Sequence, residues 1–410
     1  MVGGETGGAE NGRLSVFVPL WFAQSKSEMR ELRHDEDTKR LHHQGDCKRM
    51  AIVHFASTEV ERIEEAATLP AKFERMLNKY PLKSMVEGKT VAVKMHLGLR
   101  IVTTTIHPIF VGILVSKLKE AGAEVFVTDS PNSVRDAKRR GYTAETLGAP
   151  IVSITGFRDK YFYRRRIDFK SLKEIQIAGE IHDADFLVDL SHVKGHGHCA
   201  YAGACKNIAM GCVTQKTRHD MHAIDWGMEW DESLCTHCEL CIRACRFGAN
   251  KFDKNGQYTI EYHDCVYCQH CVNACPEGAI KMDTSGYADF QEAMALATEL
   301  VLKTFKPGNV LYINFLTDIA YICDCWGFSF PAMVPDIGIM MSDDLVAIEM
   351  ASLSKIKAKD FIEGTLPKGR KLMKGKHFFE KMHRKDPYVQ INALERRGLG
   401  SKQFRIVEVK

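Results

Sequence analysis

The sequence lacks a membrane-spanning run, a strong excess of one charge and the glycine-rich loops of nucleotide-binding proteins. No apolar stretch approaches the roughly 18–20 residues that a transmembrane helix needs, and the closest, Asn309 to Cys323, is interrupted by Asp318. The formal net charge is +4 over 410 residues, which is too small to predict nucleic-acid binding. Gly-x-Gly-x-x-Gly and Walker sequences are absent, so nucleotide cofactors lack support.

A secretory leader is also not visible, and this affects how the 14 cysteines are interpreted. Hydrophobic residues make up 45% and charged residues 26% of the chain, which is the balance of an ordinary globular protein. A chain of this length can build its own core, so a disulfide scaffold is not expected. We expect a cytoplasmic protein, in which clustered cysteines more often bind metals or iron–sulfur clusters.

Residues 1–49 differ in composition from the rest of the chain. They begin with the Gly-rich sequence MVGGETGGAENG and continue into a charged, His-containing run, and only RLSVFVPLWF is apolar. No nearby segment offers a matching apolar pattern. We therefore expect either a disordered extension or an upstream start beyond the natural one, with the folded chain starting near Met50.

From residue 50 onward, alternating strand and helix patterns predict an α/β domain with a layered, mostly parallel sheet. The expected strands cover residues 90–97, 124–130, 150–154, 185–194 and 309–316, and the expected helices include 107–123 and 289–305. A cysteine-rich segment interrupts this pattern. We therefore divide the chain into a first part of the α/β domain (50–226), a small inserted α+β module of ferredoxin-like type (227–285) and a second part of the α/β domain (286–410).

The inserted segment contains two copies of the motif C-x2-C-x2-C-x3-C, in CTHCELCIRAC and CVYCQHCVNAC. Three closely spaced thiolates can bind three irons of one cubic cluster. Zinc, the alternative, prefers four thiolates from two C-x2-C pairs and does not need a third cysteine in each motif. The motifs therefore predict two 4Fe–4S clusters, and Asn255-Gly256 between them predicts a hairpin.

Both motifs resemble those of bacterial two-cluster ferredoxins, in which the fourth cysteine of each motif binds the other cluster. This resemblance implies that one cluster is held by Cys235, Cys238, Cys241 and Cys275, and the second by Cys265, Cys268, Cys271 and Cys245. Pro276 follows the second motif, as in ferredoxins, but Arg246 follows the first. That arginine either loosens the turn or places a cation beside a cluster.

A second group of polar residues lies in a Gly-rich loop after the predicted strand 185–194. Crevices at the carboxyl ends of parallel strands are where α/β folds bind ligands, and glycines allow close backbone approach. We predict a catalytic site in which lysines stabilise negative charge and a histidine donates a proton. Its residues are Lys194, His196, Lys206 and Asn207. The alternative is a glycine-rich connector with solvated side chains.

Several segments together resemble the uncharacterised iron–sulfur-centre proteins, the domain-of-unknown-function family 362. The segments are VAVKMHLG, EAGAEVFVTDS, SHVKGHGHCAYAGACKNIAMGC, CDCWGFSFPAMVPDIGIMMSDDLVAIEMAS and the cysteine module, and they span roughly residues 50–410. Leu345 and Glu349 stand where the family commonly has proline and aspartate. The resemblance implies a fold and a cofactor, while the family has no generally assigned reaction. TTTIHPIFVGILVSKLKEAGA resembles, more weakly, the N-terminal domain of lactate racemases, which is a hint about the fold alone.

Three further features leave alternatives open. Cys323 and Cys325 could bind a metal, form a redox pair or simply be buried. His198 and Cys199 could join His196 in a metal site. The basic stretch from about residue 366 to 385 could be a solvated face or a docking surface for a small electron carrier such as ferredoxin or flavodoxin.

These features favour an oxidoreductase that transfers electrons from two 4Fe–4S clusters to an unknown small-molecule substrate. The loop residues, with His96 and Asp129, would hold that substrate. A non-catalytic electron carrier or redox-complex subunit is the first alternative, and a metal-handling or assembly protein is the second.

Overall fold

A computed structural model describes residues 50–224, 228–245, 247–261, 264–265, 270–282, 286–366 and 370–410. The disordered extension expected over residues 1–49 lies outside the described residues. Within the described part of the chain, no helix combines the length and the apolar character needed to span a membrane.

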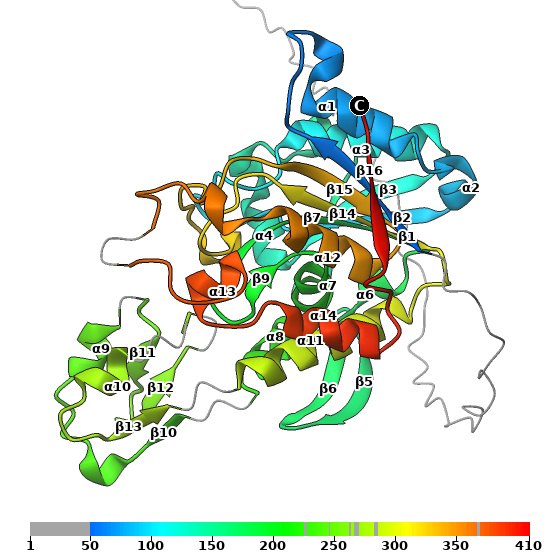
Figure 1. Cartoon of the computed structure of the whole chain (residues 1–410). Helices are drawn as coiled ribbons and strands as arrows, with labels where there is room; N and C mark the ends of the chain where they lie inside the picture. Colours follow the sequence, from blue (N-terminus) through cyan, green and yellow to red (C-terminus); the bar gives the residue numbers. More distant parts are fainter. Residues whose placement is uncertain are drawn as a thin grey trace, which may run out of the picture. The chain divides into compact units, whose positions relative to one another are not determined.

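An eight-stranded sheet forms the centre of the fold (Figure 1), with the strand order β16-β1-β15-β14-β7-β2-β3-β4. The strands are β1 (Ala51–Ser57), β2 (Thr90–Met95), β3 (Glu124–Asp129), β4 (Ile151–Ser153), β7 (Phe186–His192), β14 (Val310–Leu316), β15 (Gly338–Ser342) and β16 (Phe404–Glu408). Strand β15 runs antiparallel to β1 and β14, and the other neighbours pair in parallel. The predicted α/β class with a mostly parallel sheet is confirmed.

Helices pack on both faces of this sheet because its buried strands are apolar on both faces. In β2, Val91 and Val93 belong to the core that contains α1 and α3, whereas Ala92 belongs to the opposite core with α7, α11, α12 and α14. This alternation follows from the two-residue repeat of a strand. The helices are α1 (Leu69–Leu77), α3 (Pro108–Glu120), α7 (Ala204–Gly211), α11 (Tyr287–Leu302), α12 (Leu345–Lys355) and α14 (Tyr388–Arg396).

Shorter elements complete the domain, and several were not predicted. The expected strand 185–194 divides into β7 and the short β8 (Lys194–His196), which pairs with β9 (Ala200–Ala202). An unpredicted hairpin joins β5 (Phe162–Phe169) to β6 (Leu172–Ala178). The short helices are α2 (Leu82–Val86), α4 (Pro131–Ala137), α5 (Ala144–Leu147), α6 (Gly179–His182), α8 (Gln215–His222) and α13 (Phe378–His383).

The cysteine-rich segment has short elements and a small core of its own. They are β10 (Met228–Trp230), α9 (Leu240–Ala244), β11 (Asn250–Phe252), β12 (Tyr258–Ile260), α10 (His270–Ala274) and β13 (Ile280–Met282). Strands β11 and β12 pair antiparallel around the predicted turn, where Gly256 has a φ of +80°. Because a side chain rarely tolerates this φ, the Asn255-Gly256 signal correctly located the hairpin.

Candidate active site

A pocket of about 490 Å³ opens at the carboxyl ends of parallel strands β2, β3, β7 and β14. All four predicted catalytic residues line it: Lys194, His196, Lys206 and Asn207. His96 and Asp129 also line the pocket, as do Cys323 and Cys325. The sequence analysis grouped the loop residues with His96 and Asp129, and the structure brings them together although His96 and Asn207 are 111 positions apart, because strand ends converge at one sheet edge.

The first charged group in the pocket surrounds Asp129, the last residue of β3. Its carboxylate lies 3.1 Å from Lys94 Nζ and 3.0 Å from His96 Nδ1, and it accepts the Leu97 backbone N–H at 2.9 Å. Burial alone would raise the pKa of Asp129, but the neighbouring Lys94 and His96 hold it well below its ordinary value. Burial lowers the pKa of His96, so this histidine is neutral near pH 7.

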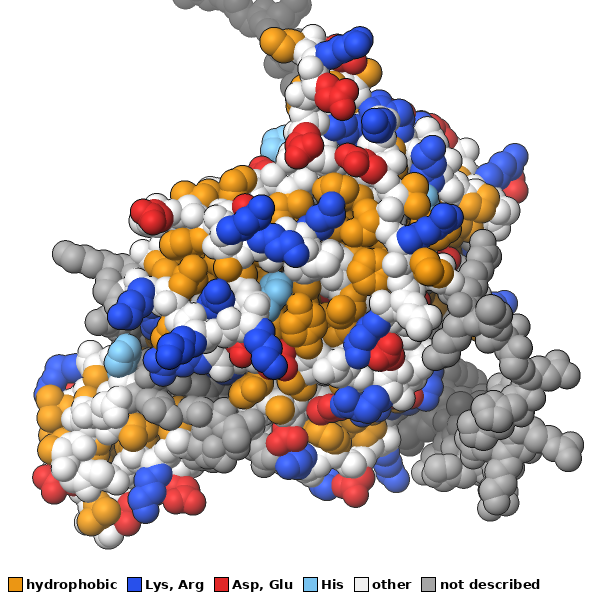
Figure 2. Space-filling model, viewed as in Figure 1, with side chains coloured by type: hydrophobic (Ala, Val, Ile, Leu, Met, Phe, Trp, Pro, Cys, Tyr) orange, Lys and Arg blue, Asp and Glu red, His pale blue; other side chains and the backbone are white. Residues whose placement is uncertain are grey.

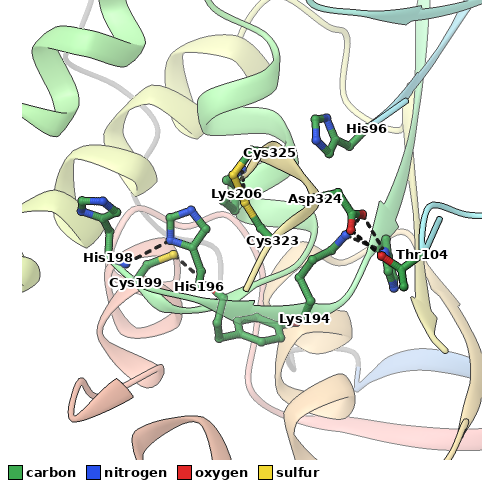
Figure 3. The surroundings of a disulfide bond; sticks show 12 residues. His96, Thr104, Lys194, His196, His198, Cys199, Lys206, Cys323, Asp324 and Cys325 are labelled. Carbon is green, nitrogen blue, oxygen red and sulfur yellow. Dashed lines mark hydrogen bonds and ion pairs between the residues drawn. A yellow bond between two sulfur atoms is a disulfide. The ribbon is translucent and has the colours of Figure 1, made fainter. Parts of the chain in front are cut away.

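The second charged group surrounds Asp324, which lies between the two cysteines of the C-x-C sequence. The carboxylate pairs with Lys194, lies 3.1 Å from His192 Nδ1 and accepts the Thr104 hydroxyl at 2.8 Å (Figure 3). Burial would raise the pKa of Asp324, but Lys194 and His192 hold it well below the ordinary value. The Lys194 and Asp324 side chains are only 4% and 2% exposed, so the ion pair is fully desolvated.

Asn207, on α7, positions Lys94 rather than facing the pocket freely. Its amide nitrogen donates to Asp189 Oδ1 at 2.5 Å and to the Lys94 carbonyl at 3.1 Å, and its amide oxygen accepts from Lys94 Nζ at 2.9 Å. A Cβ on Gly211 would lie 2.6 Å from Lys94 Cε. Glycine at this position therefore allows the Lys94 side chain to lie against α7.

Among the lysines of the pocket, Lys206 alone has no carboxylate partner within the described residues. Arg218 also lines the pocket, but its guanidinium donates to the Met210 and Val213 carbonyls at 3.4 and 2.8 Å. Lys206 Nζ lies 3.9 Å from Cys323 Sγ (Figure 3). Burial lowers the pKa of Lys206 to about 8, so it remains mostly protonated at neutral pH and can also release a proton. Lys206 is therefore the described cation best placed to bind an anionic substrate.

Cys323 and Cys325 form a disulfide bond. Together with a ring nitrogen of His196, their sulfur atoms form a group in which all ligand atoms lie within 4.8 Å of one another. The other possible metal site, formed by His196, His198 and Cys199, is not assembled in this way. The His198 backbone N–H donates to His196 Nδ1 at 3.2 Å, and Cys199 Sγ donates to the Tyr201 carbonyl at 3.0 Å. Burial raises the pKa of Cys199 to about 12, which disfavours it as a thiolate ligand.

The sequence analysis missed three residues of the two charged groups at the pocket: Lys94 and His192, which line it, and Asp324, which pairs with the lining residue Lys194. Lys94 carried a usable signal, because a lysine inside the apolar strand TVAVKM needs a buried partner. Asp324 gave no such signal, because its lysine partner lies 130 positions away in the sequence.

Glu349, on α12, is an acidic residue that contacts the start of α7. It is fully buried, and its Oε1 accepts the Cys205 backbone N–H at the start of α7, at 2.6 Å. Burial raises the pKa of Glu349 to about 7. Its role in the structure is therefore to connect α12 with α7, which carries Lys206 and Asn207.

The raised pKa of Glu349 gives a testable dependence of stability on pH. Because its folded-state pKa exceeds the ordinary value of 4.5, its contribution to stability is fully present below about pH 4.5 and is lost as the pH rises through about 7. The substitution Glu349→Gln removes this titration, so the variant should gain up to roughly 3 kcal/mol relative to wild type between pH 4.5 and 7.5. Denaturation midpoints of both proteins across this range test the expectation, and parallel pH curves would contradict it.

The cysteine motifs bring residues from both copies together. Cys235, Cys238 and Cys241 of the first motif and Cys275 of the second line one small pocket. In the loop of the first motif, His237 and Glu239 have positive φ values of 52° and 57°. Such left-handed residues turn successive backbone N–H groups toward one point, as in anion-binding nests at iron–sulfur sites.

The other predicted set is described in part. Cys265 and Cys271 are buried, and Cys245 Sγ accepts the Ala249 backbone N–H at 3.3 Å. Cys268 lies outside the described residues. Tyr258 is buried near both sets, and burial together with the nearby Cys271 and Cys241 raises its pKa.

The basic stretch near residues 366–385 is divided between surface and interior. Lys371, Lys374, Lys376 and Arg384 are exposed, whereas Lys385 is buried. Figure 2 shows Lys and Arg side chains gathered over α13 and the segment before it. The exposed residues retain the positive charge that the predicted docking surface requires.

The fold and the pocket define an α/β protein with a pocket lined by charged side chains at the carboxyl edge of its sheet. The family model described as "Domain of unknown function (DUF362)" matches residues 91–354, and the chain belongs to this family. No curated protein matches the chain.

Two solved structures are similar to the chain at low identity. The lactate racemase apoprotein from Thermoanaerobacterium thermosaccharolyticum is 13% identical over 65% of this chain and 51% of its own, with a TM-score of 0.35. A protein from Thermotoga maritima is 11% identical over 62% of this chain and 52% of its own, also with a TM-score of 0.35. The chain thus spans about half the length of these structures, and similarity this low supports no inference about its chemistry.

Proposed function

We propose that this protein is an iron–sulfur oxidoreductase that reduces a small anionic substrate in the pocket at the sheet edge. Two 4Fe–4S clusters, held by the eight motif cysteines of an inserted ferredoxin-like module, would supply electrons one at a time. The supporting observation is that Cys275 lines one small pocket together with Cys235, Cys238 and Cys241. A fourth thiolate from the other motif is the arrangement that two-cluster ferredoxins use.

The donor set fits an iron–sulfur cluster better than zinc. Four cysteines surround the small pocket, and the loop at His237 and Glu239 turns backbone N–H groups in the manner of an iron–sulfur nest. Cubic clusters carry negative charge and sulfide atoms that accept such N–H groups, whereas a structural zinc site needs only four thiolates. The loop therefore provides an environment that zinc would not require.

The α/β pocket supplies groups for substrate binding and proton transfer. Lys206 would bind a negatively charged group of the substrate, because no described carboxylate neutralises it. Lys94 and Lys194 are each neutralised by an aspartate, so they add hydrogen-bond donors rather than net charge. His196 lines the same pocket as Lys206, and both side chains lie near Cys323 Sγ, so His196 would donate a proton to the reduced substrate.

A soluble electron carrier would reduce the clusters from outside. Exposed Lys371, Lys374, Lys376 and Arg384 provide a positive surface, which attracts acidic carriers such as ferredoxins and flavodoxins. A cytoplasmic location would give the protein access to such carriers and keep its thiols reduced.

Lys206→Met tests the role of the pocket. Anaerobically prepared wild type should contain about eight irons and eight sulfides per chain, and the variant should contain the same amounts. The variant should reoxidise at least about tenfold more slowly than wild type when reduced protein is screened against small anionic oxidants, since a charge-assisted contact contributes roughly 1.5–3 kcal/mol. The matched control is Lys216→Met on the exposed face of α8. Zinc in place of iron, or equal rates for all three proteins, would contradict the proposal.

A further inference from the structure

Two cysteines of the pocket have no part in the proposed clusters. Cys323 and Cys325 form a disulfide after β14 and line the same cavity as Lys206 and His196. Cys323 is 2% exposed, whereas Cys325 is only half-buried. An attacking group would therefore meet Cys325 first, and Cys323 would remain behind it.

We propose that Cys323 and Cys325 form a redox-active dithiol–disulfide couple whose oxidant is a small anionic disulfide. The electron source of this couple, the 4Fe–4S clusters, is taken from the proposed function. The couple itself can be tested without that source. In the dithiol form, the Cys325 thiolate attacks one sulfur of the substrate disulfide and releases one substrate thiol. Cys323 then attacks Cys325 of the mixed disulfide, which releases the second thiol and restores the Cys323–Cys325 bond.

Renewal of the dithiol takes two electrons and two protons. The reductant is a low-potential one-electron donor, the class to which 4Fe–4S clusters belong. Over one cycle, a substrate disulfide, two electrons and two protons become two thiols. The protein returns to its starting state, so atoms and electrons balance.

Two side chains are placed to manage the protons of this exchange. Lys206 Nζ lies 3.9 Å from Cys323 Sγ, so its positive charge stabilises the thiolate that forms when the disulfide opens. A ring nitrogen of His196 lies within 4.8 Å of both sulfurs. Because His196 Nδ1 accepts the His198 backbone N–H, a neutral ring carries its proton on Nε2 and can donate it.

The same hydrogen bond argues against a metal ion bound by His196, Cys323 and Cys325. A histidine that ligates metal through one ring nitrogen usually donates a hydrogen bond from the other. Here Nδ1 accepts a hydrogen bond, which is the opposite role. The second experiment below distinguishes a metal ion at this site from the redox couple.

A contact between two aromatic side chains places the couple next to the cysteine-rich segment. Trp326 follows Cys325 in the sequence, and its ring lies 5.1 Å from the ring of Phe247, centroid to centroid. Phe247 is two residues from Cys245, one of the proposed cluster ligands. This aromatic contact therefore links the segment that contains a proposed cluster ligand to the segment that contains the couple.

The first experiment equilibrates the full-length protein in anaerobic glutathione redox buffers, traps thiols by alkylation and measures the peptide that carries both cysteines by mass spectrometry. We expect this peptide to pass from no alkylation to two alkylations as the buffer becomes more reducing. Iron content, measured on the same samples, reports separately on the proposed clusters. Absence of iron with a reversible transition would overturn the proposed function alone, whereas full iron content with no transition would overturn the couple.

The second experiment tests the substrate class with two disulfides of different charge. Reduced wild type should be reoxidised by glutathione disulfide at least tenfold faster than Lys206→Met, while uncharged hydroxyethyl disulfide should distinguish them much less. Cys323→Ser and Cys325→Ser should both lose this reoxidation, and Cys212→Ala, which alters a buried cysteine outside the pocket, should keep it. If one zinc or iron per chain beyond the cluster metal blocked alkylation of Cys323 and Cys325 until a chelator was added, the site would be a metal site and the proposal would be wrong.

Discussion

Cys275→Ser should remove about half of the iron, and the iron lost should be that of the cluster assigned to the first motif. The reason is geometric, since Cys275 lies in the second motif but lines the pocket of Cys235, Cys238 and Cys241. A cube that loses one of four thiolates is held by three, and serine is a poor replacement for a soft thiolate. Iron and sulfide should fall from about eight to about four per chain.

Paired variants identify which cluster is lost. Cys235→Ser should give the same spectrum as Cys275→Ser, because both alter one predicted set, whereas Cys271→Ser should give a different one. Electron paramagnetic resonance of the reduced proteins provides the comparison. The control is Cys212→Ala, which changes a buried cysteine outside both motifs and should retain all the iron. If Cys275→Ser instead matched Cys271→Ser, each motif would bind its own cluster and the crossed assignment would be wrong.

The sequence was most informative where local patterns decide the structure. Apolar runs predicted strands β2, β3, β4, β7 and β14 of the central sheet, and Asn255-Gly256 predicted the hairpin because few residues accept a φ of +80°. The β5–β6 hairpin was missed, since three consecutive arginines in FYRRRIDF give a weak apolar pattern. Strand β16 was missed for a similar reason, as most of its residues are only partly buried.

The residues of the candidate site were predictable only where a local sequence pattern contains them. Lys194, His196, Lys206 and Asn207 stood out among glycines in one loop. Their partners come from other strands: Asp324 lies 130 positions from Lys194, and Lys94 lies 113 positions from Asn207. No local pattern contains this pairing, because it depends on the strand order β14-β7-β2.

The Lys194–Asp324 pair leads to the second large expected effect. Both side chains are almost fully buried, so Lys194→Met leaves the Asp324 carboxylate without its ammonium partner in a low-dielectric site. Removing one member of a buried pair typically costs about 3–5 kcal/mol. We expect the melting temperature of Lys194→Met to fall by roughly 5–10 °C, which is larger than a purely catalytic role would produce.

A double substitution separates loss of the pair from loss of a single contact. In Lys194→Met/Asp324→Asn no buried charge remains unpaired, so most of the lost stability should return. The matched surface control is Lys216→Met, because Lys216 and Asp220 form an exposed pair on α8 worth at most about 1 kcal/mol. Lys206→Met should not destabilise the protein, since no described carboxylate depends on Lys206. If Lys194→Met melted at the wild-type temperature, Asp324 would not depend on Lys194 for its charge, and Lys194 would instead be available to bind substrate as Lys206 is.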